Sequence, residues 1–326
     1  MAHLTSPTAS PAQLGTSPAA PLTSWVLRTG PVAVAVTIVV AVLTGATSAS
    51  AAPPAWVPWV ALGCLALGIP HGAVDNLVLL GAEHRGRSAA MYVLAAAAAT
   101  GGILLWPAPA FGAVIALSVW HFGSGDVESL SDLGNARRET RPWSIVHALV
   151  LGSVPLVLPL TGGSTGATLA LIQHDLPQLG QAASGGARIV TLLLALVVVV
   201  HLATTGRRAA AAEILLLAAL GLVVTPLLAF GVYFATWHAL RHTARLAQDG
   251  AGAVHLRPLV RVVAAGLPAL ALTAAAVTLT LVTVGDVRRP GLWLWAGLAL
   301  VWGLTVPHMV VVGRFDVARR RAVATA

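Results

Sequence analysis

The pair His238 and His242 has the spacing of two ligands to one metal ion. The two residues lie four apart in the segment 237–242, within a long apolar run. On a helix, this spacing puts both imidazoles on one face, about 5–6 Å apart at Cβ, where they can share an ion. An ionisable residue inside an apolar helix costs several kcal/mol and is a functional candidate for that reason. The pair alone is weak evidence, so further donors are needed to support a metal site.

Two more histidines stand in apolar runs, and each is followed by an aspartate. His71 precedes Asp75 by four residues, and His121 precedes Asp126 by five. A ligating histidine commonly donates its other N–H to a carboxylate, so each aspartate is a candidate to orient an imidazole or its neighbour. Neutral imidazoles suit Fe(II), Cu or Zn, and four of them leave up to two open positions on a six-coordinate ion. The alternative is that these residues form hydrogen-bonded pairs that pack helices together.

The composition places these residues in a membrane protein. Of the 326 residues, 57% are hydrophobic and 9% are charged, against about a quarter charged in a soluble domain. We therefore predict an all-α fold, a polytopic integral membrane helical bundle of about 8–10 transmembrane helices. The apolar runs fall at about 32–50, 57–81, 89–106, 110–125, 143–161, 188–204, 210–245, 260–284 and 292–313.

The charged residues are informative about partners. The formal net charge is +8, and every basic residue is an arginine, because the chain contains no lysine. The arginines lie between apolar runs, as the positive-inside rule requires, so the charge does not indicate nucleic-acid binding. Without lysine, no Schiff base to a side-chain amine can form, which excludes a covalently held retinal.

The apolar runs also predict the domain organisation. We expect a disordered tail over 1–30, a single transmembrane helical domain with the metal site over 31–313, and a basic C-terminal tail over 314–326. The first run followed by Ala49-Ser50-Ala51 is alternatively a cleaved signal peptide.

The distribution of arginine predicts the topology. The loops after the first, third and fifth runs carry no basic residue, whereas the alternate loops do, which puts the N-terminus in the cytoplasm. The run 210–245 is about 54 Å long as a helix, too long for one crossing of a hydrocarbon core of about 30 Å. We expect it to turn near Pro226 and cross twice, because only then does His238 lie in the same half of the membrane as His71 and His121.

The motifs together resemble those of one family. Pro70-His71-Gly72 with Asp75, Trp120-His121-Phe122-Gly123 with Asp126, Trp237-His238 with Arg241-His242, and Pro307-His308-Met309 occur in order between about residues 56 and 313. In this combination the chain resembles the Brp/Blh family (bacteriorhodopsin-related proteins), integral-membrane β-carotene 15,15′-dioxygenases that cleave β-carotene into two molecules of retinal.

The resemblance implies a cofactor, substrates and site residues. It implies one non-haem Fe(2+) held by His71, His121, His238 and His242, no catalytic residue beyond these ligands, and β-carotene and O₂ as substrates in the lipid bilayer of the cell membrane. Asp75, Asp126 and His308 are candidates to support the ligands from behind. Aromatic residues flank the ligands and are candidates to line the polyene channel, although ordinary helix packing explains them equally well; they are Trp120, Phe122, Tyr233, Phe234 and Trp237.

Rival functions require other motifs. A membrane di-iron desaturase needs about eight histidines in paired boxes, and this chain has one such pair. A zinc protease needs His-Glu-x-x-His, which the sequence does not contain. The remaining alternative is a metal or proton-coupled transporter that uses these His and Asp side chains along its pathway.

The two-crossing topology is testable with cysteine labelling. A single cysteine placed next to Arg245 should resist a membrane-impermeant reagent added to intact cells, because this position is expected on the cytoplasmic side. A cysteine at Ala52, in a loop without basic residues, is the matched control and should react. Efficient labelling next to Arg245 would refute the cytoplasmic placement.

Overall fold

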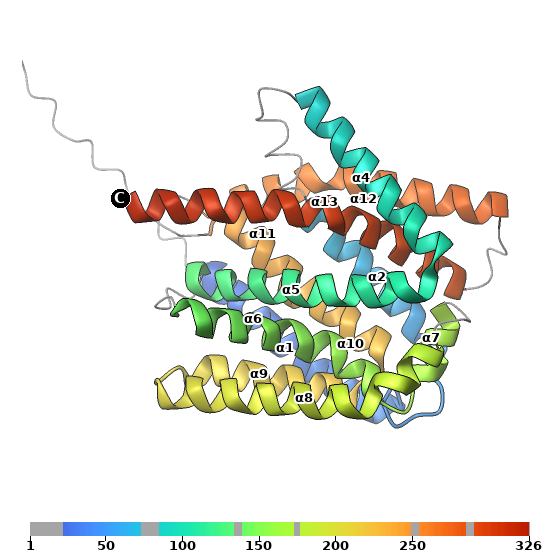
Figure 1. Ribbon diagram of the computed structural model, residues 1–326, viewed down its shortest axis with the longest axis horizontal. Coiled ribbons are helices and arrows are strands. Elements are labelled where there is room, and N and C mark those ends of the chain that lie inside the picture. Colours follow the sequence, from blue (N-terminus) through green and yellow to red (C-terminus); the bar gives the residue numbers. More distant parts are fainter. Residues whose placement is uncertain are drawn as a thin grey trace, which may run out of the picture.

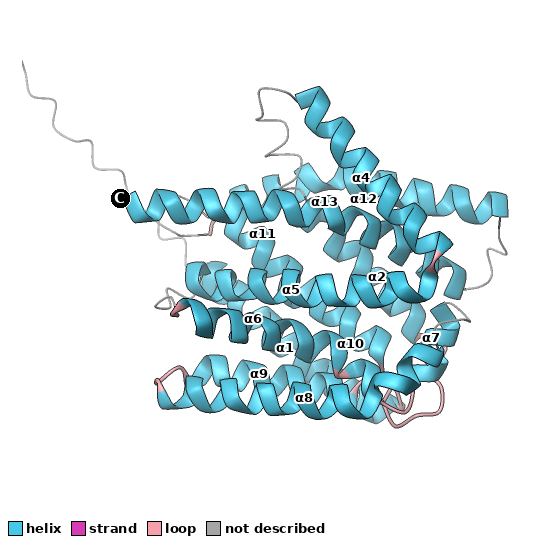
Figure 2. Ribbon diagram, in the orientation of Figure 1, coloured by secondary structure: helices cyan, strands magenta, loops and turns pink. Residues whose placement is uncertain are grey.

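The fold is a bundle of helices (Figures 1 and 2). The computed structural model describes residues 22–72, 85–133, 139–172, 177–248, 254–284 and 290–325. Within these ranges the only β-type pairings are two isolated bridges, Thr47 with Val224 and Gln248 with Val254. The predicted all-α class is confirmed.

Five described helices are long and apolar enough to cross a membrane, at Leu22–Thr44, Gly86–Leu105, Gly185–Thr204, Leu256–Leu279 and Trp295–Val317. The protein is therefore a multi-pass membrane protein. In chain order the elements are α1 (Leu22–Thr44), α2 (Val57–Gly68), η1 (Ile69–Gly72), α4 (Arg85–Leu105), α5 (Pro107–Leu133), α6 (Arg141–Val157), η2 (Pro159–Thr161), α7 (Thr165–Ile172), α8 (Pro177–Thr204), α9 (Arg208–Val223), α10 (Pro226–Val232), η3 (Tyr233–Ala239), α11 (Leu240–Leu246), α12 (Leu256–Val284) and α13 (Pro290–Thr325).

The long apolar run 210–245 is divided into two segments, as expected. Helix α9 ends at Val223, and α10 begins at Pro226 and continues through η3 into α11. The turn between them is held by the loop after α1, because the Thr225 N–H donates to the Ala46 carbonyl at 3.1 Å and the Ser48 N–H donates to the Val223 carbonyl at 2.8 Å. In Figure 1 the α8–α9 turn and the C-terminal end of α13 lie at the left of the bundle, and α9 and α10 meet toward the opposite end.

Both predicted terminal tails are partly helical. Helix α1 already begins at Leu22, because Val26 is buried in the bundle and Gly30 lies against the Trp237 ring with no room for a Cβ. Helix α13 ends at Thr325, so it includes most of the predicted C-terminal tail. Asp316, on this extension, receives a hydrogen bond from buried Arg245, which explains why the segment stays helical beyond the apolar stretch.

Helices α5 and α6 make the closest helix contact near the predicted site. A Cβ at Gly123 would collide with the Ala148 carbonyl, and one at Gly152 would collide with the Val119 carbonyl. Small residues let helix backbones approach in this way, and such contacts drive association where lipid replaces water. The glycine of the motif at 120–123 therefore has a packing role, and it fixes the helix that carries His121.

Two buried arginines attach α11 to the rest of the bundle. Arg241 donates to both oxygens of Glu213 on α9 at 3.0 and 2.9 Å, and its guanidinium lies 4.1 Å from the centre of the Trp237 ring. Arg245 donates to Asp132 on α5 at 3.0 Å and to Asp316 on α13 at 2.9 Å. Since a buried charge without a partner is strongly destabilising, these ion pairs fix α11 against α5, α9 and α13.

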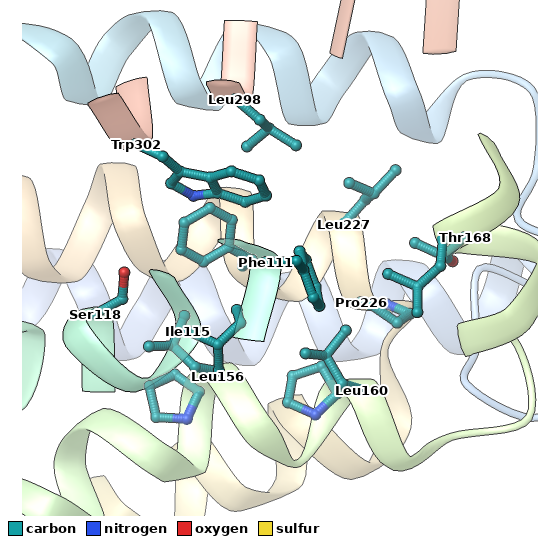
Figure 3. Close-up of a pocket in the computed structure, with 14 residues that line it drawn as sticks. Phe111, Ile115, Ser118, Leu156, Leu160, Thr168, Pro226, Leu227, Leu298 and Trp302 are labelled. Atoms are coloured by element: carbon teal, nitrogen blue, oxygen red, sulfur yellow. The ribbon is translucent and has the colours of Figure 1, made fainter. Parts of the chain in front are cut away.

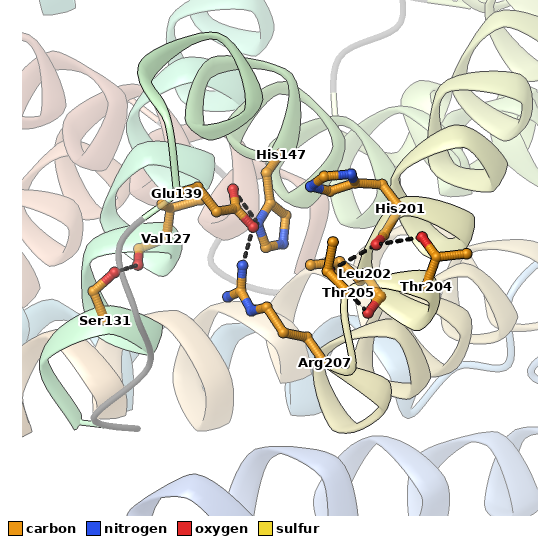
Figure 4. A network of polar contacts seen from close by, with 9 residues as sticks. All are labelled: Val127, Ser131, Glu139, His147, His201, Leu202, Thr204, Thr205 and Arg207. Atoms are coloured by element: carbon orange, nitrogen blue, oxygen red, sulfur yellow. Dashed lines mark hydrogen bonds and ion pairs between the residues drawn. The ribbon is translucent and has the colours of Figure 1, made fainter.

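Two histidines outside the predicted site have packing roles. His147 Nδ1 lies 3.2 Å from Oε1 of Glu139, a carboxylate that also contacts Arg207 (Figure 4). His201 stacks on Trp143, with ring centres 3.6 Å apart. Burial raises the pKa of the Glu139 carboxyl, but the hydrogen bonds and positive charge of His147 and Arg207 outweigh burial and hold this pKa below its usual value. The network joins the segment before α6 to the α8–α9 turn.

Candidate metal centre

A π-helical turn carries the first of the paired histidines. Residues Tyr233–Ala239 form η3, and His238 lies in it, while His242 follows in α11. The two rings lie nearly parallel, with centres 6.2 Å apart and an angle of 12° between their planes. π-Helical turns are rare and frequently occur at functional sites, so the local geometry supports the assignment made from the four-residue spacing.

Three of the predicted ligands meet in the interior. His71 of η1, His121 of α5 and His238 of η3 each offer a ring nitrogen, and these nitrogens lie within 4.8 Å of one another. The three residues come from distant parts of the sequence and from different helices. Their convergence in the bundle is the arrangement that a shared metal ion requires.

Two further imidazoles complete a five-histidine cluster, which we define as His71, His121, His238, His242 and His308. The ring centre of His242 lies 5.8 Å from that of His71 and 6.2 Å from that of His238. The ring centre of His308 lies 5.1 Å from that of His71 and 5.0 Å from that of His121. The sequence suggested His308 as a residue behind the ligands, whereas the structure places it in the same ring of imidazoles.

The remaining ring nitrogens show which atoms face the centre. His71 Nδ1 donates to the Gly68 carbonyl at 2.6 Å, and His238 Nδ1 donates to Asp126 Oδ1 at 3.0 Å. Meanwhile His121, His238 and His242 each have a buried Nε2 atom without a hydrogen-bond partner in the described structure. Buried polar atoms are ordinarily satisfied, so several unpartnered nitrogens at one place fit a bound divalent metal ion.

Asp126 supports His238 from behind. Its carboxylate is fully buried and accepts a second hydrogen bond, from the Tyr233 hydroxyl to Oδ2 at 2.8 Å. Asp126 follows His121 by five residues in the sequence, but its carboxylate accepts a hydrogen bond from His238 on the adjacent helical segment. This bond fixes the tautomer of His238 so that Nε2 is available for a ligand. Asp75, the other predicted supporting carboxylate, lies outside the described residues.

The aromatic residues near the cluster divide into three groups. Phe122 and Phe234 contact it directly, with ring centres 4.4 Å from His238 and 5.2 Å from His71 respectively. Tyr233 and Trp237 are also buried, but each contacts another residue. The Tyr233 hydroxyl donates to Asp126, and the Trp237 ring stacks on Arg241. Trp120 lies on α5 and is 46% exposed, and its role in lining a channel stays a prediction.

A small apolar cavity, of about 50 Å³, lies near these rings; Figure 3 shows the side chains that line it. One lining residue, Phe230, packs against the aromatic residues that contact the cluster, with its ring centre 5.8 Å from that of Phe234 and 6.2 Å from that of Phe122. The sequence did not identify this cavity, because its lining residues look like ordinary packing in an apolar chain. They are Phe111, Ile115, Ser118, Pro155, Leu156, Pro159, Leu160, Thr168, Leu169, Pro226, Leu227, Phe230, Leu298 and Trp302.

The fold and the site define a class: a multi-pass helical membrane protein with a buried polyhistidine centre next to an apolar cavity. Residues 62–316 match the family described as beta-carotene 15,15'-dioxygenase. The chain is also 34% identical over 318 residues to the probable beta-carotene 15,15'-dioxygenase Blh of Halobacterium salinarum, an alignment that covers 86% of this chain and 90% of that protein. This chain therefore belongs to the beta-carotene 15,15'-dioxygenase family. No solved structure matches it.

The hydrogen bond from His238 to Asp126 predicts how strongly the site holds a metal. Asp126→Asn should weaken metal binding by about 10–100-fold, because an amide orients the imidazole less well than a carboxylate. Tyr233→Phe, which removes only one of the two bonds to Asp126, should have a smaller effect. The measurement is metal retained by purified protein in competition with a chelator.

A matched control for this prediction lies on the same helix. Among the described residues, Ser131 hydrogen-bonds to the Val127 carbonyl of its own helix, so Ser131→Ala should leave metal affinity unchanged. Equal affinity of the Asp126→Asn and Ser131→Ala proteins would show that Asp126 does not orient a ligand.

Proposed function

We propose that this protein is an iron(II)-dependent dioxygenase that cleaves the central 15,15′ double bond of β-carotene with O₂ and releases two molecules of all-trans-retinal. The observation that carries the proposal is the convergence of His71, His121 and His238, with ring nitrogens within 4.8 Å of one another, in a member of a family described by this activity.

The donor set fits iron(II). His71, His121, His238 and His242 would hold the ion through neutral imidazole nitrogens, a ligand type that suits Fe as well as Cu and Zn. Bound iron(II) would supply open coordination positions for the activation of O₂. The described part of the site places no carboxylate among the imidazoles, because Asp126 binds the far side of His238.

The protein residues keep the site rigid and dry. His121, His238 and His242 are each at most 5% exposed, and Phe122 and Phe234 cover the cluster on the side of the apolar cavity. Exclusion of water prevents side reactions of reactive intermediates. The Arg241 and Arg245 ion pairs hold the helix that carries His242 in place. Selective cleavage of one double bond requires such accurate positioning.

The apolar cavities suit a hydrocarbon substrate. The cavity in Figure 3 is apolar and has a volume of about 50 Å³. A second apolar cavity, of about 220 Å³, lies between α2, α12 and α13 and includes Ile69, two residues before His71. A rod-shaped substrate that reacts at its centre must extend away from the metal in two directions, and we propose that these two apolar regions widen to receive its ends. β-Carotene dissolves in the bilayer, so a site inside the helical bundle spares it a passage through water.

The proposed setting is the cell membrane, with the N-terminus in the cytoplasm. This orientation follows from the arginine-bearing loops, and the labelling experiment next to Arg245 tests it. The chain contains no lysine, so the retinal product leaves the enzyme without covalent attachment.

Expression in a β-carotene-producing bacterium tests the activity. Cells that make the protein should lose their orange colour and accumulate retinal, whereas the His238→Ala protein should leave the colour unchanged. His201→Ala is the matched control, because His201 stacks on Trp143 away from the cluster, and it should remain active. Unchanged colour with wild-type protein present in the membrane would contradict the proposal, and iron retention by purified protein separates this enzyme from a transporter.

The cavity can be tested with a bulky residue. Leu227, 5% exposed, lines the cavity from α10, and Leu227→Trp should fill it and slow β-carotene cleavage at least tenfold while iron content stays constant. An apocarotenoid that lacks one end ring should be affected less, because it needs less room. Leu215→Trp, at a 57% exposed position on α9, is the control. Equal slowing of both substrates would show that the cavity holds no end of the polyene.

A further inference from the structure

His308 lies against three of the four histidines that the motifs identify as ligands, although the motifs give His308 itself no ligand role. Its ring centre lies 5.1 Å from that of His71, 5.0 Å from that of His121 and 6.0 Å from that of His242. The side chain is 5% exposed and comes from α13, a helix that carries none of the other four. His308 therefore lies against three imidazoles at once.

These distances can be compared with what one shared ion requires. Two imidazoles bound to one ion through nitrogen at about 2.1 Å have ring centres roughly 4.6 Å apart at right angles and roughly 6.5 Å apart when opposite. Seven ring pairs in the five-histidine cluster have centres 5.0–6.2 Å apart, within this window. By ring-centre distance the three pairs that involve His308 match the other four, while the ring nitrogens that lie within 4.8 Å of one another are those of His71, His121 and His238.

A supporting role from behind does not account for the contacts. A side chain that orients a ligand contacts the far nitrogen of that one ligand, as Asp126 does with His238. His308 instead approaches three rings from three different elements. By the same measure it is nearer to His71 and His121 than His242 is to His71 or His238.

The position of His308 is fixed by its helix. Gly303, one turn earlier, allows α13 to pack directly on Thr100 and Ala96 of α4, where a Cβ would collide. Asp316, two turns later, accepts the hydrogen bond from Arg245. α13 is thus held on both sides of His308, so the ring is presented to the cluster by a rigid element.

We propose that His308 donates a fifth imidazole nitrogen to the same metal ion as His71, His121, His238 and His242. This inference rests on the proposed function, since it assumes that the cluster holds a metal. Its consequence is that a six-coordinate ion keeps one open position instead of two. His308 is then a direct ligand and not a residue of helix packing.

Cobalt(II) as a spectroscopic substitute tests the coordination number without any need for activity. Purified wild-type protein, His308→Ala, His308→Leu and the His201→Ala control are loaded with Co(II) in the absence of substrate, and their visible ligand-field spectra and metal affinities are measured. Leucine keeps an apolar side chain at the site, so it guards against loss of folding in the alanine variant.

Loss of a direct ligand should change both readings. We expect the ligand-field bands of the His308 variants to shift and gain intensity, as coordination number falls, and the affinity to drop at least about 100-fold, the upper end of what loss of a supporting residue causes. Added imidazole should restore the wild-type spectrum of His308→Ala, because it can occupy the vacated position. The His201→Ala spectrum should equal that of wild type.

Two other outcomes have separate meanings. A wild-type spectrum in His308→Leu with Co(II) bound would overturn the fifth-ligand proposal and leave the four-histidine site intact. Failure of wild-type protein to bind Co(II) or Fe(II) at all would overturn the proposed function itself, and this inference with it.

Discussion

The structure depends on the cost of burying polar groups in an apolar interior. Such a group without a partner costs several kcal/mol in hydrocarbon, and the buried charged groups near the site are accordingly paired. Arg241 binds Glu213, Arg245 binds Asp132 and Asp316, and Asp126 binds His238 and Tyr233. Several buried polar atoms of the described residues lack a hydrogen-bond partner, and the Nε2 atoms of His121, His238 and His242 differ from the rest in belonging to one cluster of imidazoles. A metal ion is the simplest partner that satisfies these three together.

The buried arginines and two of the histidines lie on the same helical segment. His238, Arg241, His242 and Arg245 occupy successive turns of the same helical segment, with the histidines directed to the centre and the arginines to α9, α5 and α13. Because each arginine contacts a different neighbouring helix, the segment is fixed in rotation as well as in position. Arg241, which appeared in the sequence as part of a family motif, and Arg245 thus hold the donors in place.

The sequence was sufficient for the features set by local spacing and composition. The helical class follows from the apolar runs, and the turn between α9 and α10 follows from the length of one run and Pro226. The convergence of His71, His121 and His238 could be predicted because intramembrane histidines are costly. By contrast, no local signal pairs Asp126 with His238, since this contact depends on how α5 packs against η3.

Other features depended on packing that a single sequence does not reveal. The position of His308 within the cluster depends on α13, and the cavity of Figure 3 is formed by Phe111, Leu227 and Trp302 from three separate helices. Trp120 looked like a channel residue because it precedes His121, yet neighbouring residues on a helix point about 100° apart. The helical parts of the two predicted tails make tertiary contacts, among them those of Val26, Gly30 and Asp316, which the sequence alone does not show.

The π-helical turn at Tyr233–Ala239 bears on how this site can change over generations. Such a turn holds one residue more than an α-helical turn, so loss of a single codon within it would regularise the helix and leave the flanking helices close to their present rotation. Loss of a codon from α10 would instead rotate everything beyond it by about 100°, and the histidines and arginines would then leave their partners. The π-helical turn is therefore the part of this segment that best tolerates a change in length.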